Sequence, residues 1–345
     1  MPTPWDFLAS SASEQQAQQA DIRCAATEVA LGEHAGRICA LLDWGVISAR
    51  GADAAAFLHS QLSNDIKAMD AASSRLAAYC NPKGRALALL RVLRTDDGLL
   101  LLTHRALIDS LIRRLRLFVL RSKVTLDDAS EAIAVIGLHG PGVTQPLRQI
   151  MGAIPEPVGS VHCVGGVQLI RLSCAPDRFA LAVPAGELTG LWSRLAHTLP
   201  VVDMEAWQLS EIRAGIPTIT PATQEVFVPQ MLNLEPLQGI SYEKGCYPGQ
   251  EVIARMHYLG KLKRRMYRLR SQGEATPSPG ETVRTAEGGQ EAGIVVAAAR
   301  ASQDNHELLA VLRTELADQG ELVLNGTPLQ LRELPYAFDT ESSSS

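Results

Sequence analysis

The sequence predicts an α+β protein with two mixed lobes of strands and helices, followed by a small β-barrel. The first observation is that strand-like and helix-like segments alternate in mixed order from about residue 37 to 128. The second is that a similar order of elements recurs from about 133 to 199, without clear sequence identity. The third is that only short strand-like segments, separated by Gly, Pro and Asp turns, follow Lys261, and this spacing suits a barrel.

In the first lobe, "RICALLDWGVISARG" looks like two strands and "ADAAAFLHSQL" like a short helix. "RLAAYCNPKGRALALLRVLR" predicts a hairpin that turns at Pro82 to Arg85, and "DDGLLLLT" adds a strand. Apolar residues at helical spacing predict a helix over 107–116, and "KVTLDD" returns as a strand.

In the second lobe, "AIAVIGLHG" predicts a strand, which is followed by a helix over 144–151 and by a hairpin in "HCVGGVQLIRL". A strand is then predicted in "RFALAVP" and a helix in "ELTGLWSRLAHTL". A helix from about Asp203 to Ala214 leads into "GIPTITPATQEVFVPQMLNLE", which is too long for an ordinary connection and is expected to be functional or disordered. Strands are predicted at 262–270, 291–299, 306–314 and 321–332.

The bulk composition is that of a globular protein of two or three domains. Its 345 residues carry 32 Lys and Arg against 37 Asp and Glu, a net charge of -5, so any polyanion must meet a local patch. Neither a basic leader nor an apolar run of about 20 residues is present, which predicts a soluble, cytoplasmic protein with no membrane partner. The polar stretch 9–20 and the terminal "TESSSS" predict mobile tails.

The six cysteines have neither CxxC pairs nor zinc-ligand spacing, so we expect no disulfide framework and no metal site. Five of them lie in apolar or strand-like surroundings and are expected to behave as small buried hydrophobes: Cys24, Cys39, Cys80, Cys163 and Cys174. The sixth, Cys246, differs because it lies between glycines in "SYEKGCYPGQEVIAR".

The surroundings of Cys246 favour a reactive thiol. Lys244 supplies a cation, and a helix beginning near Gln250 supplies a positive end, both of which stabilise a thiolate. Gly245 and Gly249 allow left-handed turn angles and a close backbone approach to a ligand. The alternative is a turn whose cysteine simply packs beneath it, and the residues alone leave both interpretations open.

A basic stripe follows this turn. Seven Lys and Arg and no acid lie between Val252 and Gly273, of which Arg255, Lys261 and Lys263 are the expected anion-binding residues. The stripe suits carboxylates or phosphates, and Tyr258 and Tyr267 could stack on bases. The alternative is a solvated basic strand.

Four motifs carry a family resemblance: "KGCYPGQE" at 244–251, "GADAAAFLHSQLSND" at 51–65, "NPKGRALALLRV" at 81–92 and "RAGIP" at 213–217. On these motifs the chain resembles the YgfZ family, folate-binding proteins that support iron-sulfur cluster enzymes and are related to the glycine-cleavage aminomethyltransferase, or T-protein. The resemblance spans roughly 35–335 and implies two intertwined, ferredoxin-like lobes around a central hole that holds the folate.

The domains implied are a first lobe over 35–130, completed by 203–260, a second lobe over 131–202 and a barrel over 261–335. Outside them lie a partly mobile leader, 1–34, and a mobile tail, 336–345. The resemblance implies tetrahydrofolate or a derivative as cofactor, with Cys246 and Lys244 as the functional groups. The cofactor contacts expected from it are Glu211, Arg213, Tyr242, Gly245, Tyr247, Gly249, Gln250 and Glu251.

Two departures from T-proteins affect the expected chemistry. T-proteins carry acidic residues after the turn of the first-lobe hairpin, where this chain has Ala88 and Leu89. They also place a pterin-binding Glu immediately before the "AG" that ends a helix, where this chain has Arg213, with Glu211 two residues earlier. Residues two apart do not share a helix face. The aminomethyl transfer of T-proteins is therefore not expected.

Two functions follow from the sequence. One is a folate-binding accessory factor for assembly or repair of iron-sulfur cluster enzymes, with Cys246 as its thiolate and with those enzymes or assembly factors as partners. The other is a folate-dependent one-carbon transferase that acts on tRNA or protein, with Cys246 as nucleophile. In either case the basic stripe would receive a polyglutamylated folate tail or the phosphates of tRNA.

Overall fold

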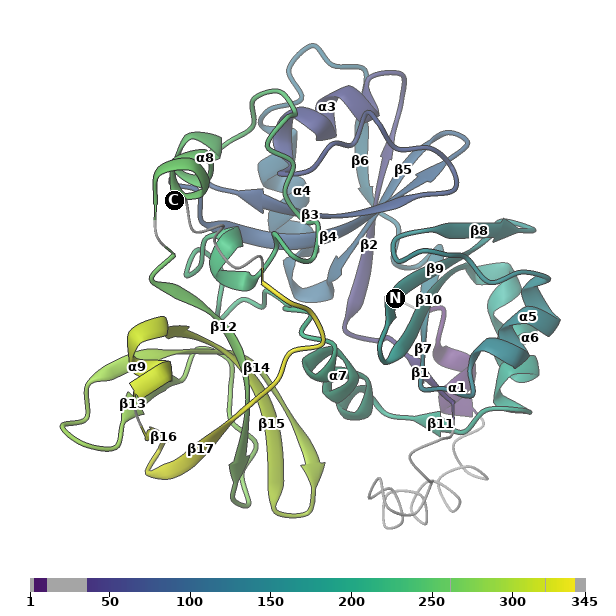
Figure 1. The fold of residues 1–345 in the computed structure, drawn as a ribbon. Helices are drawn as coiled ribbons and strands as arrows, with labels where there is room; N and C mark the ends of the chain where they lie inside the picture. The colour runs from purple at the N-terminus through teal and green to yellow at the C-terminus, as the bar shows by residue number, and fades with distance from the viewer. Residues whose placement is uncertain (1–2, 11–35, 261, 320, 339–345) are drawn as a thin grey trace.

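The computed structural model describes residues 3–10, 36–260, 262–319 and 321–338. Two β-sheets with their helices form the two lobes, and a closed barrel lies beside them (Figure 1). This confirms the predicted α+β class and the barrel. Residues 11–20, the terminal "TESSSS", Cys24 and Lys261 lie outside the described residues. Within the described ranges, no helix is long and apolar enough to cross a membrane.

The first sheet has five antiparallel strands in the order β3-β4-β5-β2-β6. They are β2 (Trp44–Arg50), β3 (Ser74–Cys80), β4 (Ala86–Thr95), β5 (Gly98–His104) and β6 (Thr125–Asp128). Helices α3 (Ala54–Gln61) and α4 (Ile108–Arg116) lie near this sheet, the latter directly after the 3-10 turn η1 (Arg105–Leu107). Leu111, Ile112 and Leu115 of α4 are buried because their helical spacing puts them on one face.

The second sheet has six strands in the order β11-β1-β7-β10-β9-β8. They are β1 (Arg37–Ala40), β7 (Ile133–His139), β8 (Val161–Val164), β9 (Val167–Cys174), β10 (Asp177–Pro184) and β11 (Val201–Val202). The sequence assigned residues 37–40 to the first lobe, whereas β1 pairs with β7 and β11 of the second sheet. The pairing differs because strand alternation fixes which face is buried but not which neighbour the strand meets.

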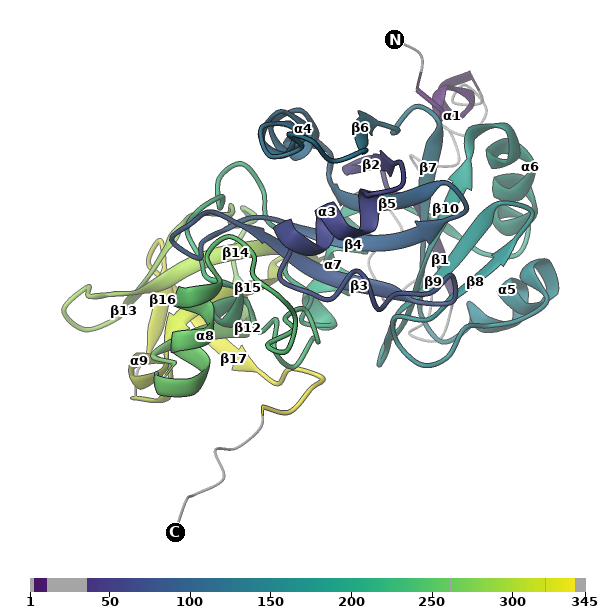
Figure 2. The ribbon, with the colours of Figure 1, turned by 90° about the horizontal axis from the view of Figure 1, so that it is seen from above.

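Helices α5 (Thr144–Met151) and α6 (Ala185–Ala196) pack on the outer face of the second sheet, together with the N-terminal helix α1 (Asp6–Ser10). Trp5 is buried there, and its ring centroid lies 5.4 Å from that of Trp192. The predicted leader 1–34 therefore contributes a core residue. Figure 2 shows α5 and α6 at one end of the molecule and the barrel at the other.

The two sheets face each other across a shared apolar layer. Leu100 and Leu102 of the first sheet and Ile170 and Leu172 of the second belong to it, with Trp207 of helix α7 (Met204–Arg213), which is fully buried. The edges are also joined, because Val161 N donates to Ala72 O at 2.8 Å. The shared layer and the joined edges hold the two sheets together as one body.

The barrel closes in the order β12-β15-β14-β13-β16-β17. Its strands are β12 (Arg264–Gln272), β13 (Thr282–Thr285), β14 (Glu291–Ser302), β15 (Asn305–Arg313), β16 (Leu322–Leu324) and β17 (Thr327–Arg332). The single strand predicted at 321–332 is thus two strands, since Asn325 and Gly326 adopt φ of 50 and 83 and turn the chain. Helix α9 (Thr314–Gln319) has six residues and was not predicted.

The prediction that a mobile tail begins at residue 336 is wrong. The Tyr336 hydroxyl donates to Gly215 O at 2.8 Å, and burial raises the pKa of Tyr336 to about 12. The Arg265 guanidinium lies 4.3 Å from the Phe338 ring centroid. These aromatic side chains pack because the segment runs back along the lobes instead of leaving the barrel into solvent.

Candidate functional site

The turn that carries Cys246 packs directly on the hairpin turn of the first lobe. Helix α8 (Gln250–Leu259) begins after Gly249, whose φ is 81. A Cβ atom on Gly249 would lie 2.6 Å from Asn81 O and 2.6 Å from Gly84 Cα. Asn81 Oδ1 in turn accepts from the backbone N–H groups of Lys83 and Arg85. The "NPKGR" and "KGCYPGQE" motifs are therefore one structural unit.

Gly249→Ala should lower the free energy of unfolding by about 2 to 4 kcal/mol, because the new methyl group meets backbone at a left-handed position. Gly245→Ala is the matched control. Gly245 has no positive φ, and the atom nearest to a Cβ placed there would be His59 Nε2, 4.0 Å away. Gly245→Ala should therefore change the free energy of unfolding by less than about 0.5 kcal/mol. Denaturant unfolding of both variants measures this, and equal losses would contradict it. The sequence interpretation of a left-handed turn thus holds for Gly249 and not for Gly245.

Lys244 is almost fully buried beneath this turn. Its Nζ donates to Gly245 O at 3.1 Å and lies 4.4 Å from the ring centroid of Tyr247. Desolvation by burial lowers the pKa of Lys244 to about 8, although the charges of Asp65 and Cys246 act in the opposite direction. Lys244 therefore changes charge much nearer to neutral pH than an exposed lysine does.

His59 of α3 is a neighbour that the sequence interpretation did not include. Its Nδ1 lies 3.0 Å from Asp65 Oδ1, and its Nε2 faces the backbone at Gly245. Burial, followed by the charge of Lys244, lowers the pKa of His59, so the neutral ring is favoured at neutral pH. In the sequence His59 occurs singly and without metal-ligand spacing, and its only local signal is Asp65 six residues later in "LHSQLSND".

Cys246 is exposed, as a reactive thiol requires. The other described cysteines divide into two groups. Cys39 and Cys80 are buried, and desolvation raises the pKa of Cys80 to about 12. Cys163 and Cys174 are exposed, so the expectation that they are buried is wrong. Cys163 lies on β8, the outermost strand of its sheet, and Cys174 lies at the end of β9, so neither reaches the core.

The other residues of the segment 242–251 that were expected to contact the cofactor interact with protein groups or face solvent. Tyr242 donates to Glu235 Oε1 and stacks on His257 at 3.8 Å, and burial raises its pKa. Tyr247 is buried below the turn, and Gln250 Oε1 accepts from Tyr247 N at 3.3 Å. Glu251 is exposed. These residues shape the turn around Cys246 and are not directed into a cavity.

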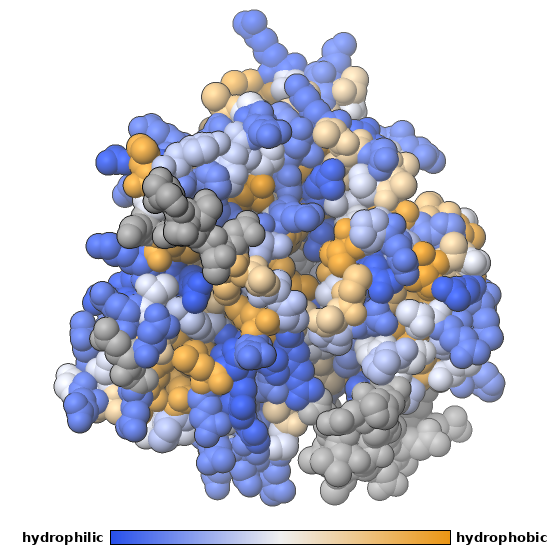
Figure 3. All heavy atoms as spheres, in the orientation of Figure 1, coloured by the Kyte–Doolittle hydropathy of each residue, from blue (hydrophilic) through white to orange (hydrophobic). Residues whose placement is uncertain are grey.

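A central cavity of about 250 Å³ lies where the two lobes and the barrel meet. Its walls come from β4, β5, α7, the segment 216–220 and strand β14 of the barrel. Figure 3 shows apolar patches on both sides of the middle of this face. Among the residues expected to contact the cofactor, Glu211 lines the cavity, and residues 242–251 do not. The cavity and the Cys246 turn are thus separate places in the structure, although the sequence analysis treated them as one.

Two charged groups of the cavity, Glu211 and Arg178, are buried. Glu211 Oε1 lies 3.3 Å from Arg178 Nη2, and Arg178 is fully buried, with its Nε donating to Ser210 Oγ at 3.0 Å. Burial raises the pKa of Glu211, and the charge of Arg178 opposes that rise. Arg91 of β4 also lines the cavity. Leu89 lines it too, whereas T-proteins have a carboxylate in this region by the resemblance given above.

Arg213 points away from the cavity to the barrel. Its Nε and Nη2 donate to Glu307 Oε1 at 3.0 and 2.9 Å, and Arg268 donates to Glu307 Oε2 at 2.8 and 2.6 Å. Glu211 and Arg213 therefore serve different purposes, because residues two apart on α7 face different sides.

The basic stripe is only partly available to a ligand. Arg268 pairs with Glu307, and both Nε and Nη2 of Arg270 donate to Asn305 Oδ1. Arg255 and Lys263 are exposed, and Tyr258 is 67% exposed. Tyr267 is half-buried, and the Cζ atom of Arg265 lies 5.0 Å from the centroid of the Tyr267 ring. The exposed anion-attracting groups thus lie on and after α8, beside the Cys246 turn.

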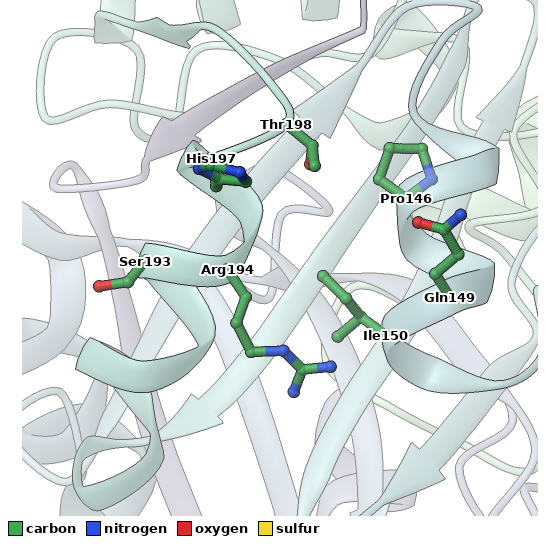
Figure 4. A pocket seen from close by; sticks show the side chains of 7 residues that line it. All are labelled: Pro146, Gln149, Ile150, Ser193, Arg194, His197 and Thr198. Atoms are coloured by element: carbon green, nitrogen blue, oxygen red, sulfur yellow. The ribbon is translucent and has the colours of Figure 1, made fainter.

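A second depression, of about 500 Å³, lies between α5 and α6 on the outer side of the second lobe. In Figure 4, Ile150 comes from α5, and Arg194 from α6 lies beside it. This depression is remote from both the central cavity and the Cys246 turn. Among the described residues, no group of three or more His, Cys, Asp and Glu is arranged to hold a metal ion.

The chain has an aminomethyltransferase-like fold. The chain matches the glycine cleavage system aminomethyltransferase T from Bartonella henselae with a TM-score of 0.70, at 15% identity, over 88% of this chain and 86% of that one, which shows a common fold. The "tRNA-modifying protein YgfZ" of Yersinia pestis (strain Pestoides F) is 31% identical over 307 residues, 87% of this chain and 92% of the relative. The protein of the same name from Serratia proteamaculans (strain 568) is 30% identical over 309 residues, which are 88% of this chain and 93% of that relative. The chain belongs to the YgfZ family, which confirms the resemblance, while no protein-family model matches it.

Proposed function

We propose that this protein is a cytoplasmic folate-binding accessory factor for the assembly or repair of iron-sulfur cluster enzymes, including enzymes that modify tRNA. The observation that carries the proposal is an exposed thiol, Cys246, held over a buried Lys244 in a turn that packs on the other family motif. The relatives named as tRNA-modifying proteins support the link to tRNA.

The residues of the central cavity fit a reduced folate. A mostly apolar wall with a few converging polar groups suits a flat heterocycle, and Arg178 Nη1 is a buried donor without a hydrogen-bond partner in the described chain. Leu76, Leu89 and Leu102 would pack against the rings, and Glu211, Arg178 and Arg91 would supply the polar contacts. Bound tetrahydrofolate would supply a one-carbon carrier.

At the turn, a buried cation lies near the Cys246 side chain. Burial lowers the pKa of Lys244 to about 8, so Lys244 still carries its charge at neutral pH and loses it as the pH rises through that value. Neutral His59, with Nδ1 beside Asp65, leaves Nε2 as a proton acceptor on the same side of the turn. We propose that Cys246 acts as a ligand or transfer thiol for a cluster component supplied as substrate.

The second candidate is a folate-dependent one-carbon transferase that acts on tRNA or protein. The exposed Arg255, Lys263 and Tyr258 beside the Cys246 turn favour a polyanionic substrate. A turnover assay with tetrahydrofolate, a one-carbon donor and unmodified tRNA distinguishes the two, since only the transferase gives a modified nucleoside in the absence of cluster enzymes.

Tetrahydrofolate should bind the purified full-length chain with one site, measured by isothermal titration calorimetry. Leu89→Arg, which places a long charged group in the cavity, should abolish that binding. Gly245→Ala, at the separate turn, should leave it unchanged. Absence of binding at near-millimolar protein would remove the folate from the proposal.

The protein should not catalyse glycine cleavage. Ala88 is fully buried and Leu89 lines the cavity, so neither can move a proton or stabilise a cationic one-carbon adduct. The rate of methylene-tetrahydrofolate formation from an aminomethyl-lipoyl donor should equal the rate without protein. A rate above that background, lost in a Leu89→Arg variant, would contradict this expectation.

A further inference from the structure

Apolar and basic side chains form an exposed patch where helix α4 ends, at the edge of the molecule (Figure 2). The segment 113–123, "RRLRLFVLRSK", holds five Lys and Arg and no acid. Three large apolar side chains lie among them, with exposed fractions of 72% for Leu117, 46% for Phe118 and 89% for Leu120. Scattered exposed apolar residues are ordinary, but a cluster rimmed by charged groups is typical of an interaction site.

The turn that carries this patch is held in place by the fold. The backbone N–H groups of residues 117, 118 and 119 each donate to the carbonyl oxygen three residues earlier, at 3.2, 3.0 and 3.3 Å. Ser122 N donates to Val119 O at 2.8 Å, and the Val119 side chain packs on the core of the lobe. At the end of the turn, Lys123 N donates to Asp53 Oδ2 at 2.7 Å. The backbone of the patch is thus already ordered, which lowers the entropy cost of binding a partner.

Leu120 has a conformation that the described fold does not explain. Its φ is 44, a left-handed value that a residue with a Cβ atom adopts only at a cost. Its side chain is almost fully exposed, so packing within the chain does not offset that cost. Glycine or asparagine would suit the backbone better. A leucine here is therefore suited to a contact outside the chain.

Three cations form the rim of the patch. Arg116 is engaged within the chain, because its Nη2 donates to Asp127 Oδ1 at 3.0 Å. Arg113, Arg121 and Lys123 are exposed, and the described residues provide no ion pair for their side chains. In a chain with a net charge of -5, this rim is a local attraction for carboxylates or phosphates.

The apolar side chains decide between the classes of anionic partner. Nucleic acid is bound mainly by aromatic stacking and by contacts to its phosphates, and two of the three exposed apolar residues are aliphatic. A bilayer surface is bound by the apolar face of a helix, whereas Leu111, Ile112 and Leu115 of α4 are buried within the lobe. An acidic protein segment with apolar side chains of its own matches both the centre and the rim of the patch.

We propose that the patch over 113–123 is a docking surface for an acidic, amphipathic segment of a partner protein. The three exposed apolar side chains would contact the apolar face of that segment, and the three cations of the rim would contact its carboxylates. This surface is separate from the Cys246 turn, since Figure 2 shows α4 and α8 at different sides of the first lobe. The inference therefore does not depend on the proposed chemistry of the thiol.

A synthetic peptide tests this by fluorescence anisotropy on the full chain. The probe is a labelled helical peptide of about 16 residues, with leucines on one face and glutamates on the others. We expect it to bind, and we expect added salt to weaken the binding. The same peptide with glutamine in place of every glutamate should bind at least about tenfold more weakly.

Variants of the chain locate the binding. Leu120→Gly removes the exposed side chain and suits the backbone angle, so it should fold normally and weaken the acidic peptide at least about tenfold. Arg113→Gln combined with Arg121→Gln should weaken it by a similar factor, and unfolding curves show whether both variants are folded. Leu331→Ser and Arg332→Gln, at exposed positions of β17, are the matched controls and should bind as the native chain does.

Several results would overturn the proposal. They are a chain that does not bind the acidic peptide, equal binding of the glutamine peptide, and folded patch variants that bind as tightly as the native chain. Transfer RNA and phosphatidylserine-containing vesicles are tested in the same way. If either of them binds through the patch while the acidic peptide does not, the surface serves another class of partner and the proposal is wrong.

Discussion

On the proposed function, Cys246→Ser is expected to abolish the support of iron-sulfur enzymes while leaving the fold intact. The side chain is exposed in a turn, so exchanging sulfur for oxygen removes little burial and should change the free energy of unfolding by less than about 0.5 kcal/mol. A serine hydroxyl cannot replace a thiol as a nucleophile or as a ligand for a cluster component. The measurement is the activity of cluster enzymes, and the level of cluster-dependent tRNA modifications, in cells that carry the variant as their only copy.

The controls use the two other exposed thiols. Cys163→Ser and Cys174→Ser remove equally accessible sulfurs far from the turn and should keep full function. Unfolding curves must show that Cys246→Ser is folded, so that loss of function reports the thiol itself. Full activity of Cys246→Ser, or equal losses in all three variants, would show that the exposed thiol at this turn has no special role.

Glu307→Gln is expected to lower the free energy of unfolding by about 2 to 3 kcal/mol. Glu307 is buried on the barrel and accepts four hydrogen bonds from Arg213 of α7 and Arg268 of β12. A glutamine keeps the shape but removes the negative charge that the guanidinium groups of Arg213 and Arg268 share. Denaturant unfolding at neutral pH measures the loss, and Asp97→Asn, from an exposed pair, should cost less than about 0.5 kcal/mol.

The Glu307 effect should also depend on pH. Burial alone would raise the pKa of Glu307, but Arg213 and Arg268 outweigh it and hold the pKa below its usual range. A carboxylate with a lowered pKa stabilises the fold above its ordinary pKa and loses that contribution as pH falls through the folded value. The difference between native protein and Glu307→Gln should therefore shrink below about pH 4. A difference independent of pH would mean that the ion pairs do not provide the stability.

Hydrophobic periodicity was enough to predict most helices and strands, including the hairpin at Pro82 to Arg85 and the strands of the barrel. It missed β13 and α9, which are too short for a periodic signal to stand out. It also could not place β1, because alternation says which face of a strand is buried and not which strand lies beside it. It did not predict the burial of Trp5, because the five-residue helix α1 that follows is too short for a periodic signal.

The sequence was enough to predict which residues belong to the candidate site, but not how they are arranged in space. The motif identified Cys246, Lys244 and Gly249, but contacts between distant segments decide what surrounds them. His59 meets Gly245 only because α3 and the turn pack together. Arg213 was expected at a cofactor and instead pairs with Glu307, because the direction of a helix side chain depends on which elements pack around the helix.

The order in which the chain leaves the ribosome has a consequence for the Cys246 turn. Every strand of the two sheets has been synthesised by Val202, so both sheets can close on a nascent chain. The "NPKGR" turn, however, receives its partner only when Gly249 and α8 have emerged. The Cys246 turn is thus positioned among the last steps of assembly, and a protein truncated after α7 would retain both sheets yet lack this turn altogether.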